Sequence, residues 1–300
     1  PLGTPPGVLE AVCRALPRLH RYPDPYCRRL VQAIAGHEQV PASYILCGNG
    51  AADLIYTYCA ALRPRTAVEL APTFVEYGAG LAQVGCRVER YFLHQAQNFD
   101  LDERFLSFLE GKKPEVVFLC NPNNPTGRLI PLPLLEQILQ YCAAQGARLF
   151  LDECFLDLTE DGVSAKSLLA AHPELLILKA FTKSYGMAGI RLGYCLCADN
   201  ALLRRMAAAS PPWNVSSPAQ SAGVTALGFW VCPSHANYLL FRGPLGLREG
   251  LLQQGIAIRG CGNYNGLGDG WYRIAVRPHG ENEALITAIR QFCKEKSLWQ

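Results

Sequence analysis

Asn121-Pro122-Asn123-Asn124-Pro125-Thr126-Gly127 directly follows Val116 to Cys120, an apolar run that is typical of a buried strand. Two more apolar runs end in a distinctive residue: Leu151-Asp152-Glu153 ends one of them in acids, and Phe181-Thr182-Lys183 ends the other in a lysine. Open α/β sheets hold ligand groups at the carboxyl ends of their strands. The three segments therefore predict an α/β fold with a ligand site at one edge of its sheet.

Each of these residues has an ordinary interpretation beside the chemical one. Lys183 at the end of a buried strand can be desolvated, which lowers the pKa of its amine and lets it form a Schiff base, and Arg191 could hold a phosphate. Taken alone, such a lysine is more often a solvated residue at a strand end. Asp152 would need a cation or hydrogen bonds, and a protonated heterocyclic nitrogen would supply the cation. The Asn-Pro-rich segment could equally be a tight turn.

The rest of the chain supports this fold class, because short β-rich runs alternate with helical stretches. We expect strands at residues 67–70, 88–92, 116–120, 149–151, 176–178 and 192–196, and helices at 51–62 and 132–145. Cys47-Gly48-Asn49-Gly50 is interpreted as a break before the first of these helices. Strands that alternate with helices predict right-handed crossovers and a mainly parallel sheet covered on both sides.

The chain divides into three expected parts. Residues 1–30 form an N-terminal segment, in which Arg21-Tyr22-Pro23-Asp24-Pro25 interrupts a helical pattern, and residues 31–227 form a large domain. Residues 228–300 predict a small α+β domain, with strands at 236–241, 256–259 and 271–276 and helices at 245–254 and 281–296.

The composition excludes several classes of protein. Half of the 300 residues are hydrophobic and only 18% are charged. A formal net charge of +3 is too small to predict the broad basic surface that binding to nucleic acid or an anionic membrane needs. The thirteen cysteines include no CxxC pair and no zinc-type Cys/His spacing, which predicts reduced thiols and no metal site. Without a signal peptide or an apolar run of about 18 residues, we expect a cytoplasmic protein with no membrane span.

The three segments, in this order and at this spacing, resemble the fold-type I family of pyridoxal-phosphate enzymes, the aspartate aminotransferase superfamily. The resemblance covers nearly the whole chain. It implies pyridoxal 5'-phosphate as the cofactor and a mainly parallel seven-stranded sheet in the large domain. It also implies four roles: Lys183 forms a Schiff base with the cofactor, Asp152 pairs with its pyridine nitrogen, Asn124 contacts its phenolic oxygen, and Arg191 holds its phosphate.

The resemblance implies further cofactor contacts. Phe74 takes the place of the aromatic residue that stacks on the ring. Gly50 and Ala51 would offer backbone N–H groups to the phosphate at the start of a helix. Ala180 departs from the usual Ser or Thr, which removes one phosphate contact, and we expect Thr182 to compensate.

Arg259 and Arg273, 14 residues apart on an expected pair of strands, could be ordinary exposed residues. Their separation matches the substrate-anchoring pair of the histidinol-phosphate aminotransferase branch, so we expect them to bind a substrate carboxylate and phosphate. Asn124 is also expected near the substrate. Tyr22 matches a tyrosine that reaches the cofactor phosphate from the neighbouring subunit, which implies a homodimer.

Four other segments look most like the threonine-phosphate decarboxylases of cobalamin biosynthesis, close relatives of the histidinol-phosphate aminotransferases. They are residues 19–25, 152–157, 236–240 and 258–267. Phe155 stands where many aminotransferases have a tyrosine that donates to the cofactor oxygen, and this change leads us to expect decarboxylation, with Lys183 returning the proton to Cα. The expected substrate is phosphothreonine, with phosphoserine and histidinol phosphate left open, and the product is an aminopropanol phosphate.

Two other functions compete with this one. An aminotransferase that uses 2-oxoglutarate has the same fold and cofactor. A ligand-sensing domain of the kind fused to winged-helix regulators is the weaker alternative, because no basic DNA-binding module accompanies the expected fold.

The junction at Leu227 and Gly228 departs from the family, because relatives have a long helical connection there. Either a deletion has removed this bridge or residues are missing from the sequence, and we expect the second. The abrupt start at Pro1 points the same way, because relatives have a short N-terminal segment that helps to bind substrate.

Overall fold

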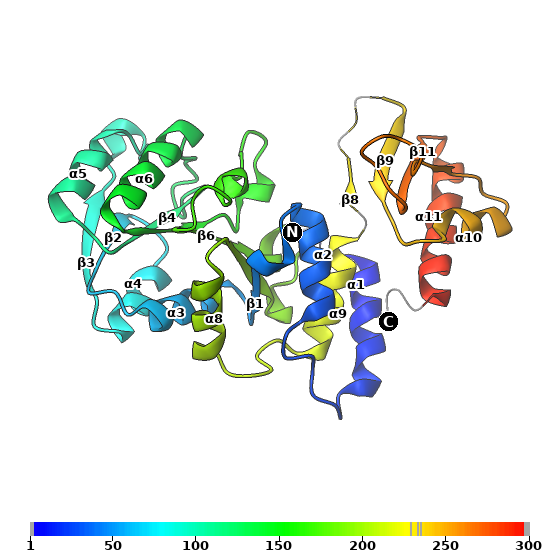
Figure 1. The fold of residues 1–300 in the computed structure, drawn as a ribbon, viewed down its shortest axis with the longest axis horizontal. Coiled ribbons are helices and arrows are strands. Elements are labelled where there is room, and N and C mark those ends of the chain that lie inside the picture. The colour runs from blue at the N-terminus through cyan, green and yellow to red at the C-terminus, as the bar shows by residue number, and fades with distance from the viewer. Residues whose placement is uncertain (1–2, 229, 233, 235, 297–300) are drawn as a thin grey trace.

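Two sheets organise the computed structural model, which describes residues 3–228, 230–232, 234 and 236–296 (Figure 1). The larger sheet has seven strands in the order β1-β7-β6-β5-β4-β2-β3. They are β1 (Ile45–Gly48), β2 (Thr66–Ala71), β3 (Arg87–Phe92), β4 (Val116–Cys120), β5 (Arg148–Asp152), β6 (Leu175–Ala180) and β7 (Gly193–Cys197). β2 to β6 run parallel, and β7 is antiparallel to both of its neighbours. The expected mainly parallel seven-stranded sheet is confirmed.

The central strands of this sheet are buried on both faces. Every residue of β4, β6 and β7 is buried. Parallel strands in such a position read as continuous apolar runs, which explains why the sequence predicts them. β1 is missing from the expected strands, because it is four residues long, pairs only with β7 at the sheet edge, and ends inside the segment interpreted as a break.

Helices cover both faces of the large sheet. One face packs against α3 (Ala51–Leu62), α4 (Glu76–Gln83) and α8 (Asn200–Ala209), and the other against α1 (Pro6–Ala15), α2 (Arg28–Glu38), α5 (Arg104–Lys112), α6 (Leu132–Gln145) and α9 (Ser217–Leu227). Shorter helical elements are η1 (Leu16–Arg18), η2 (Ala42–Tyr44), η3 (Gln95–Gln97), η4 (Leu156–Leu158), η5 (Ala165–Leu168), α7 (Phe181–Ser184) and η6 (Ala188–Ile190). The helices expected at residues 51–62 and 132–145 are confirmed with these bounds. Within the described ranges, every helix is too short or too polar to span a lipid bilayer.

A ladder of aromatic rings fills the core between the sheet and helices α3 and α4. Phe118 and Phe150, on adjacent strands, stack with ring centroids 4.8 Å apart. Tyr58 packs edge-on against Phe150 at 4.9 Å, and Tyr77 lies 5.6 Å from Phe118. Phe74 continues the ladder by meeting Tyr77 edge-on at 5.6 Å. Such offset and edge-to-face pairs add to the stability that burial of the rings supplies.

The remaining residues form the small α+β unit that the sequence predicts. Its antiparallel sheet has the order β10-β11-β9-β8, with strands β8 (Trp230–Val231), β9 (Tyr238–Arg242), β10 (Arg259–Gly260) and β11 (Trp271–Ala275). Helices α10 (Leu247–Gln253) and α11 (His279–Glu295) pack against a separate core in this unit. The strand expected at residues 256–259 is only two residues long, because Ile256 and Ile258 pack into that core and the hydrogen-bonded pairing of β10 with β11 begins at Arg259.

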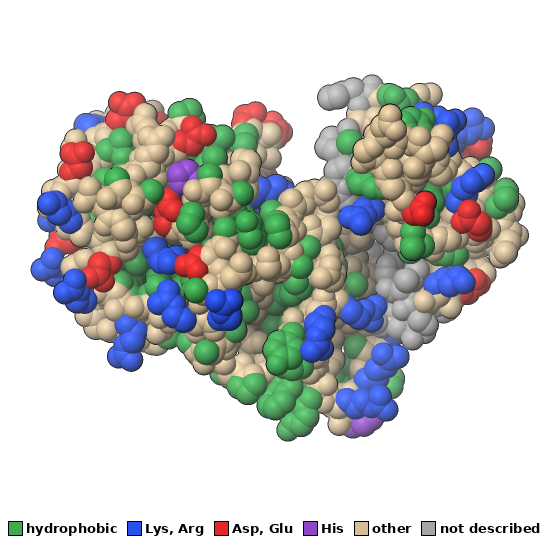
Figure 2. Space-filling view, in the orientation of Figure 1, with side chains coloured by type: hydrophobic (Ala, Val, Ile, Leu, Met, Phe, Trp, Pro, Cys, Tyr) green, Lys and Arg blue, Asp and Glu red, His purple; other side chains and the backbone are tan. Residues whose placement is uncertain are grey.

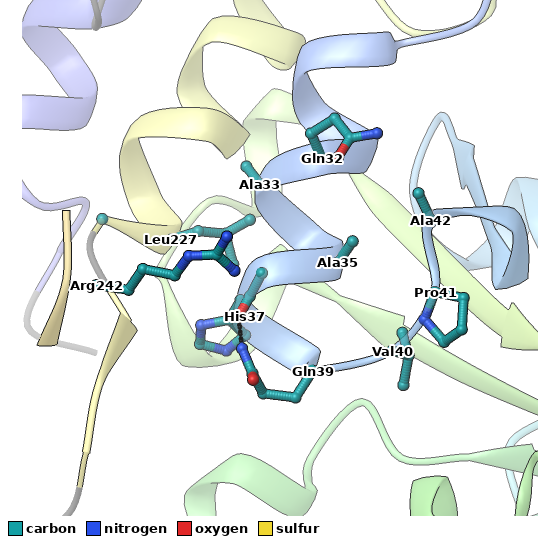
Figure 3. Close-up of a pocket in the computed structure, with 12 residues that line it drawn as sticks. Gln32, Ala33, Ala35, His37, Gln39, Val40, Pro41, Ala42, Leu227 and Arg242 are labelled. Carbon is teal, nitrogen blue, oxygen red and sulfur yellow. Dashed lines mark hydrogen bonds between the residues drawn. The ribbon is translucent and has the colours of Figure 1, made fainter. Parts of the chain in front are cut away.

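The junction between the two units contains a cavity. α9 ends at Leu227, and Gly228 follows it with a φ of 56°. Only two residues of the sequence lie between Leu227 and Trp230, too few for the long connection that the resemblance implies. A cavity of about 580 Å³ lies here, lined by α2, the end of α9 and Arg242 of β9 (Figure 3).

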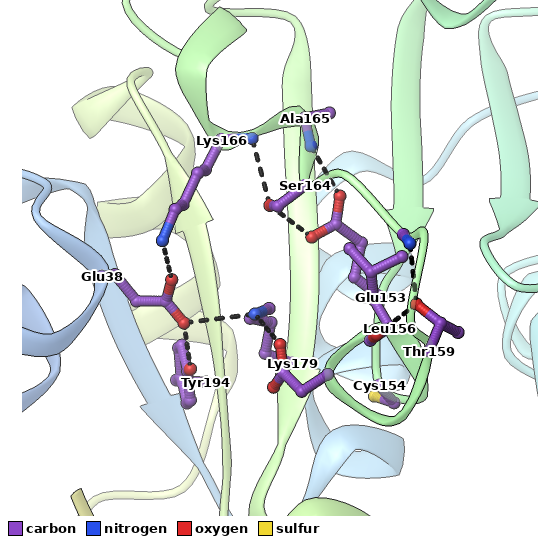
Figure 4. A network of polar contacts seen from close by, with 12 residues as sticks. Glu38, Glu153, Cys154, Leu156, Thr159, Ser164, Ala165, Lys166, Lys179 and Tyr194 are labelled. Atoms are coloured by element: carbon purple, nitrogen blue, oxygen red, sulfur yellow. Dashed lines mark hydrogen bonds and ion pairs between the residues drawn. The ribbon is translucent and has the colours of Figure 1, made fainter. Parts of the chain in front are cut away.

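A buried network of charges ties α2 to the centre of the large sheet (Figure 4). Glu38 of α2 accepts from Lys166 Nζ at 2.9 Å and from the Tyr194 hydroxyl at 2.5 Å, and it lies 3.4 Å from Lys179 Nζ. Lys179 also contacts Asp157 at 2.8 Å. Burial by itself would raise the pKa of Glu38, but Lys179 and Lys166 outweigh it and hold that pKa at about 2.

Glu38→Gln is expected to lower the free energy of unfolding at pH 7 by about 3 kcal/mol, because the folded state binds the Glu38 proton less tightly than the unfolded state. This stability is present above the ordinary pKa of 4.5 and is lost as the pH falls from there to about 2. Urea titrations between pH 7 and pH 3 should show the two proteins converging at the acid end. Glu10→Gln removes an exposed helical ion pair and serves as the control, for which no such convergence is expected.

Candidate active site

A cavity of about 210 Å³ lies at the carboxyl ends of the parallel strands. Cys120 ends β4, Asp152 ends β5, and Lys183 lies in α7, which begins directly after β6. The cavity is lined by Ala51, Ala52, Phe74, Tyr77, Cys120, Asn124, Asp152, Cys154, Phe155, Thr182, Lys183, Ala188 and Arg191. The structure thus brings most of the residues singled out in the sequence around one space.

Asp152 is buried in the wall of this cavity, and no cation pairs with it among the residues that the structure describes. The Tyr77 hydroxyl donates to Oδ2 at 2.7 Å, and the Cys154 backbone N–H donates to Oδ1 at 2.9 Å. Burial raises the pKa of the Asp152 carboxyl, and the Cys154 thiol, the Tyr77 hydroxyl and the Cys154 N–H oppose that rise by stabilising the anion. A protonated ring nitrogen held against Asp152 would supply the cation that a buried carboxylate requires.

Gly50 and Arg191 form a cradle for an anion at the start of α3. Gly50 has a φ of 90°, which other residues adopt only with strain, and a Cβ there would lie 2.7 Å from a guanidinium nitrogen of Arg191 and displace the end of that side chain. Ala51 and Ala52 follow as the first residues of the helix, whose opening N–H groups have no helical partner. A cation beside a helix N-terminus is suited to a phosphate group.

Asn123 joins two loops of the cavity wall. Its Nδ2 donates to the Pro72 carbonyl oxygen at 3.0 Å, and its Oδ1 accepts from Thr73 Oγ1 at 2.9 Å. One loop carries Asn124 and the other carries Phe74, both of which line the cavity. The buried amide therefore fixes the distance between an aromatic wall and a polar one.

Glu153 closes the loop that follows β5 (Figure 4). Its carboxylate accepts from Ser164 Oγ at 2.6 Å and from the Ala165 N–H at 2.9 Å. The closed loop presents Phe155 to the cavity, where Lys183 Nζ lies 5.1 Å from the centre of its ring. An ammonium at that distance is attracted to the face of the ring.

Lys183 has two interpretations from the sequence that differ in its exposure. The chemical interpretation of the sequence has a desolvated amine and the ordinary one a solvated lysine at a strand end, and Lys183 is exposed in the structure. The physical reason is that the burial of β6 ends with Ala180, and Lys183 lies three residues further along, in α7. Ala180 offers no hydroxyl, whereas Thr182 lines the cavity as expected.

Three expected site residues lie elsewhere in this structure. Tyr22 is 79% exposed and its ring centroid is 4.7 Å from that of Trp213. Hydrophobic side chains gather at the lower edge of the face that Figure 2 shows. Arg259 of β10 and Arg273 of β11 are cross-strand partners in the small sheet, and neither lines the cavity. The cations that line it are Lys183 and Arg191.

Several lining residues were not expected from the sequence. Tyr77 and the thiols of Cys120 and Cys154 lie in or beside apolar runs, where they resemble ordinary core residues. Tyr77 carries one usable signal, because it follows Phe74 by three residues, a spacing that places two side chains on one helical face. In the described part of the chain, no three His, Cys, Asp or Glu side chains are grouped as metal ligands would be.

Comparison with known proteins identifies the family. The family model "Aminotransferase class I and II" matches residues 1–229. The threonine-phosphate decarboxylase of Salmonella typhimurium is 38% identical over 323 residues, which cover 97% of this chain and 88% of the relative. The histidinol-phosphate aminotransferase of a Geobacillus species is 32% identical over 334 residues, which cover 99% of this chain and 89% of the relative. Both alignments are longer than the chain itself, so the relatives have residues with no counterpart in it.

Solved structures share the fold. The histidinol-phosphate aminotransferase of Sinorhizobium meliloti, crystallised in complex with pyridoxal-5'-phosphate, superposes with a TM-score of 0.67 at 22% identity. The match covers 97% of this chain and 89% of that one. At this level of identity the likeness establishes the architecture alone.

Gly50→Ala is expected to destabilise the protein by roughly 1–3 kcal/mol, because alanine is strained at this φ and its Cβ would collide with Arg191. Gly189→Ala is the matched control: it lies in η6, two residues before Arg191, has no positive φ and has open space where a Cβ would be added. Urea unfolding of both variants checks the expectation. Equal stabilities would show that position 50 does not require the backbone conformation that only glycine adopts without strain.

Proposed function

The chain belongs to the aminotransferase class I and II family, and from that premise we propose that it is a pyridoxal-phosphate-dependent decarboxylase of L-threonine O-3-phosphate. The product would be (R)-1-aminopropan-2-yl phosphate, an intermediate of cobalamin biosynthesis. The observation that carries the choice of reaction is the 38% identity to a threonine-phosphate decarboxylase over 97% of the chain. The 32% identity to a histidinol-phosphate aminotransferase makes transamination the second candidate.

The cavity fits the cofactor on four counts. Asp152 is a buried carboxylate that no cation among the described residues pairs with, and Phe74 forms an aromatic wall. Arg191 and the start of α3 form an anion cradle, and Lys183 supplies an amine. When bound, pyridoxal phosphate supplies an electron sink for the negative charge that develops at the substrate Cα.

The residues of the chain would orient the reaction and move one proton. Asp152 would keep the ring nitrogen protonated, and Arg191 and the N-terminus of α3 would hold the phosphate. Loss of the carboxyl group as carbon dioxide leaves an electron pair at Cα, to which the Lys183 ammonium would deliver a proton. Asn124 would contact the phenolic oxygen and border the substrate.

Phe155 supports decarboxylation over transamination. Its ring borders the cavity and faces Lys183, but it has no hydroxyl to donate to the cofactor oxygen. One hydrogen bond of the aminotransferase pattern is therefore absent, which alters the proton affinity and electronics at the reacting end of the ring.

The substrate anions need binding groups from outside the cavity, because Lys183 and Arg191 are already committed to the cofactor. We propose Arg259 and Arg273 for this role, through an approach of the small unit to the cavity. Their guanidinium groups pack on Tyr264 and Tyr238, which leaves planar donors for a carboxylate or a phosphate.

The subunit and domain arrangements are also proposals. A homodimer would bring Tyr22 to the partner's cofactor, and its 79% exposure and its contact with Trp213 support an intermolecular role. We propose division into an N-terminal segment (1–30), a large domain (31–227) and a small domain (228–300); the separate core beyond residue 240 supports the small domain, whereas the N-terminal segment shares the core of the large domain. Thirteen free cysteines support a reducing, cytoplasmic location.

Product analysis separates the two candidate reactions. With phosphothreonine and added pyridoxal phosphate, the protein should release carbon dioxide without 2-oxoglutarate and form no glutamate when 2-oxoglutarate is added. Phosphoserine and histidinol phosphate serve as competing substrates. Lys183→Ala should lose at least about 1,000-fold in kcat, because the amine both holds the cofactor and moves the proton. Glutamate formation without carbon dioxide would contradict the proposal.

Phe155→Tyr tests the link between this residue and the reaction type. A hydroxyl at this position should restore a donor toward the cofactor oxygen and raise the ratio of transamination to decarboxylation by roughly tenfold, the effect of one hydrogen bond to a charged group. The ratio is measured as glutamate formed against carbon dioxide released. An unchanged ratio would show that Phe155 does not influence the choice between decarboxylation and transamination.

A further inference from the structure

We propose that Tyr77 is a positioning residue whose hydroxyl acts through Asp152 to keep the proton on the cofactor's ring nitrogen. This inference rests on the proposed function. It assigns a role to a side chain that lines the cavity and touches the one carboxylate in its wall.

The hydrogen bonds of Asp152 define what remains for a ligand. Oδ2 accepts from the Tyr77 hydroxyl and Oδ1 accepts from the Cys154 N–H, so each oxygen has one protein donor. A carboxylate can accept about four hydrogen bonds, so lone pairs remain for a cationic donor in the cavity. The two protein donors also fix the plane of the carboxylate.

Tyr77 is held firmly enough to perform this task. It is fully buried near the start of α4, and its ring contacts Phe118 and Phe74. One residue earlier, Glu76 accepts from the Tyr56 hydroxyl of α3 at 2.6 Å. These contacts on both sides of Tyr77 fix the direction in which its hydroxyl points.

The charge states around Asp152 make Tyr77 a donor at all ordinary pH values. Burial, reinforced by the neighbouring Asp152, raises the pKa of the Tyr77 hydroxyl well above its usual value, so it stays protonated. Burial likewise raises the pKa of the Cys120 thiol to about 12 and that of the Cys154 thiol well above its usual value, so both are neutral. The Cys154 thiol and the Tyr77 hydroxyl both stabilise the anionic form of this carboxyl, and the hydroxyl is the stronger type of donor and lies 2.7 Å from Oδ2.

The consequence concerns a shared proton. A hydrogen bond to the carboxylate lowers its proton affinity, so a proton between Asp152 and a ring nitrogen stays on the nitrogen. Without the Tyr77 hydroxyl, Asp152 becomes the stronger base and draws the proton toward itself. The ring then accepts electrons less well, so the chemical step slows while substrate binding does not change.

The experiment compares Tyr77→Phe with Tyr58→Phe in holoenzyme reconstituted with pyridoxal phosphate labelled with ¹⁵N in the ring. The two tyrosines are a matched pair, because both are fully buried and both contact Phe118 and Phe150. The Tyr58 hydroxyl, in contrast, has no hydrogen-bond partner in the described part of the chain.

Tyr77→Phe should move the ¹⁵N resonance toward that of unprotonated pyridine and lower kcat for carbon dioxide release by roughly tenfold, with KM within about twofold of the wild type. Tyr58→Phe should leave all three quantities unchanged. Incorporation of 3-fluorotyrosine at position 77, a more acidic donor, should move the resonance in the opposite direction and gives a second measurement if Tyr77→Phe does not fold.

A resonance unmoved in both position-77 variants, or equal effects of Tyr77→Phe and Tyr58→Phe, would overturn the role of Tyr77. In either case the wild-type protein would still bind the cofactor and release carbon dioxide, so the proposed function would stand. Failure of the wild-type chain to bind pyridoxal phosphate would instead overturn both.

Discussion

A carboxylate buried without a cation is the constraint on which the site depends. Asp152 ends a strand whose neighbours are apolar, and the fold gives it a hydroxyl and one backbone N–H. Removing a charge from water is unfavourable unless it is paired, so this arrangement is stable only with a protonated carboxyl or with a ligand that brings positive charge. The surrounding features, a phosphate cradle on one side and an amine on the other, then define how long and how flat that ligand must be.

The sequence predicts those strands correctly whose burial alone determines the pattern of apolar residues. β4 to β7 are continuous apolar runs because helices cover both faces of the sheet, and the motif residues at the ends of β4 and β5 reach the cavity as a result. β1 escapes prediction because a four-residue edge strand that ends in glycine has too few side chains to show a period. Tyr77 escapes it because a tyrosine in an apolar helix is indistinguishable from core until a partner for its hydroxyl is seen.

Long-range geometry is the other part that the sequence cannot supply. Lys183 stands close to a buried strand in the sequence, yet a turn of helix takes its amine out of the sheet and leaves it exposed. Arg259 and Arg273 have the expected mutual register, but their distance from the cavity depends on how the small unit sits on the large one. That placement depends on the short connection between α9, which ends at Leu227, and β8, which begins at Trp230.

The aromatic ladder from Tyr58 to Phe74 has a thermodynamic consequence for ligand binding. Tyr58, Tyr77, Phe118 and Phe150 each contact at least two other rings, and the half-buried Phe74 packs edge-on against Tyr77, so the wall of the cavity has lost much of its rotamer freedom during folding. A flat ligand that docks against Phe74 therefore meets a preorganised surface, and little further entropy is lost at the moment of association. The entropic penalty for shaping the pocket has been moved from recognition to the folding of the chain.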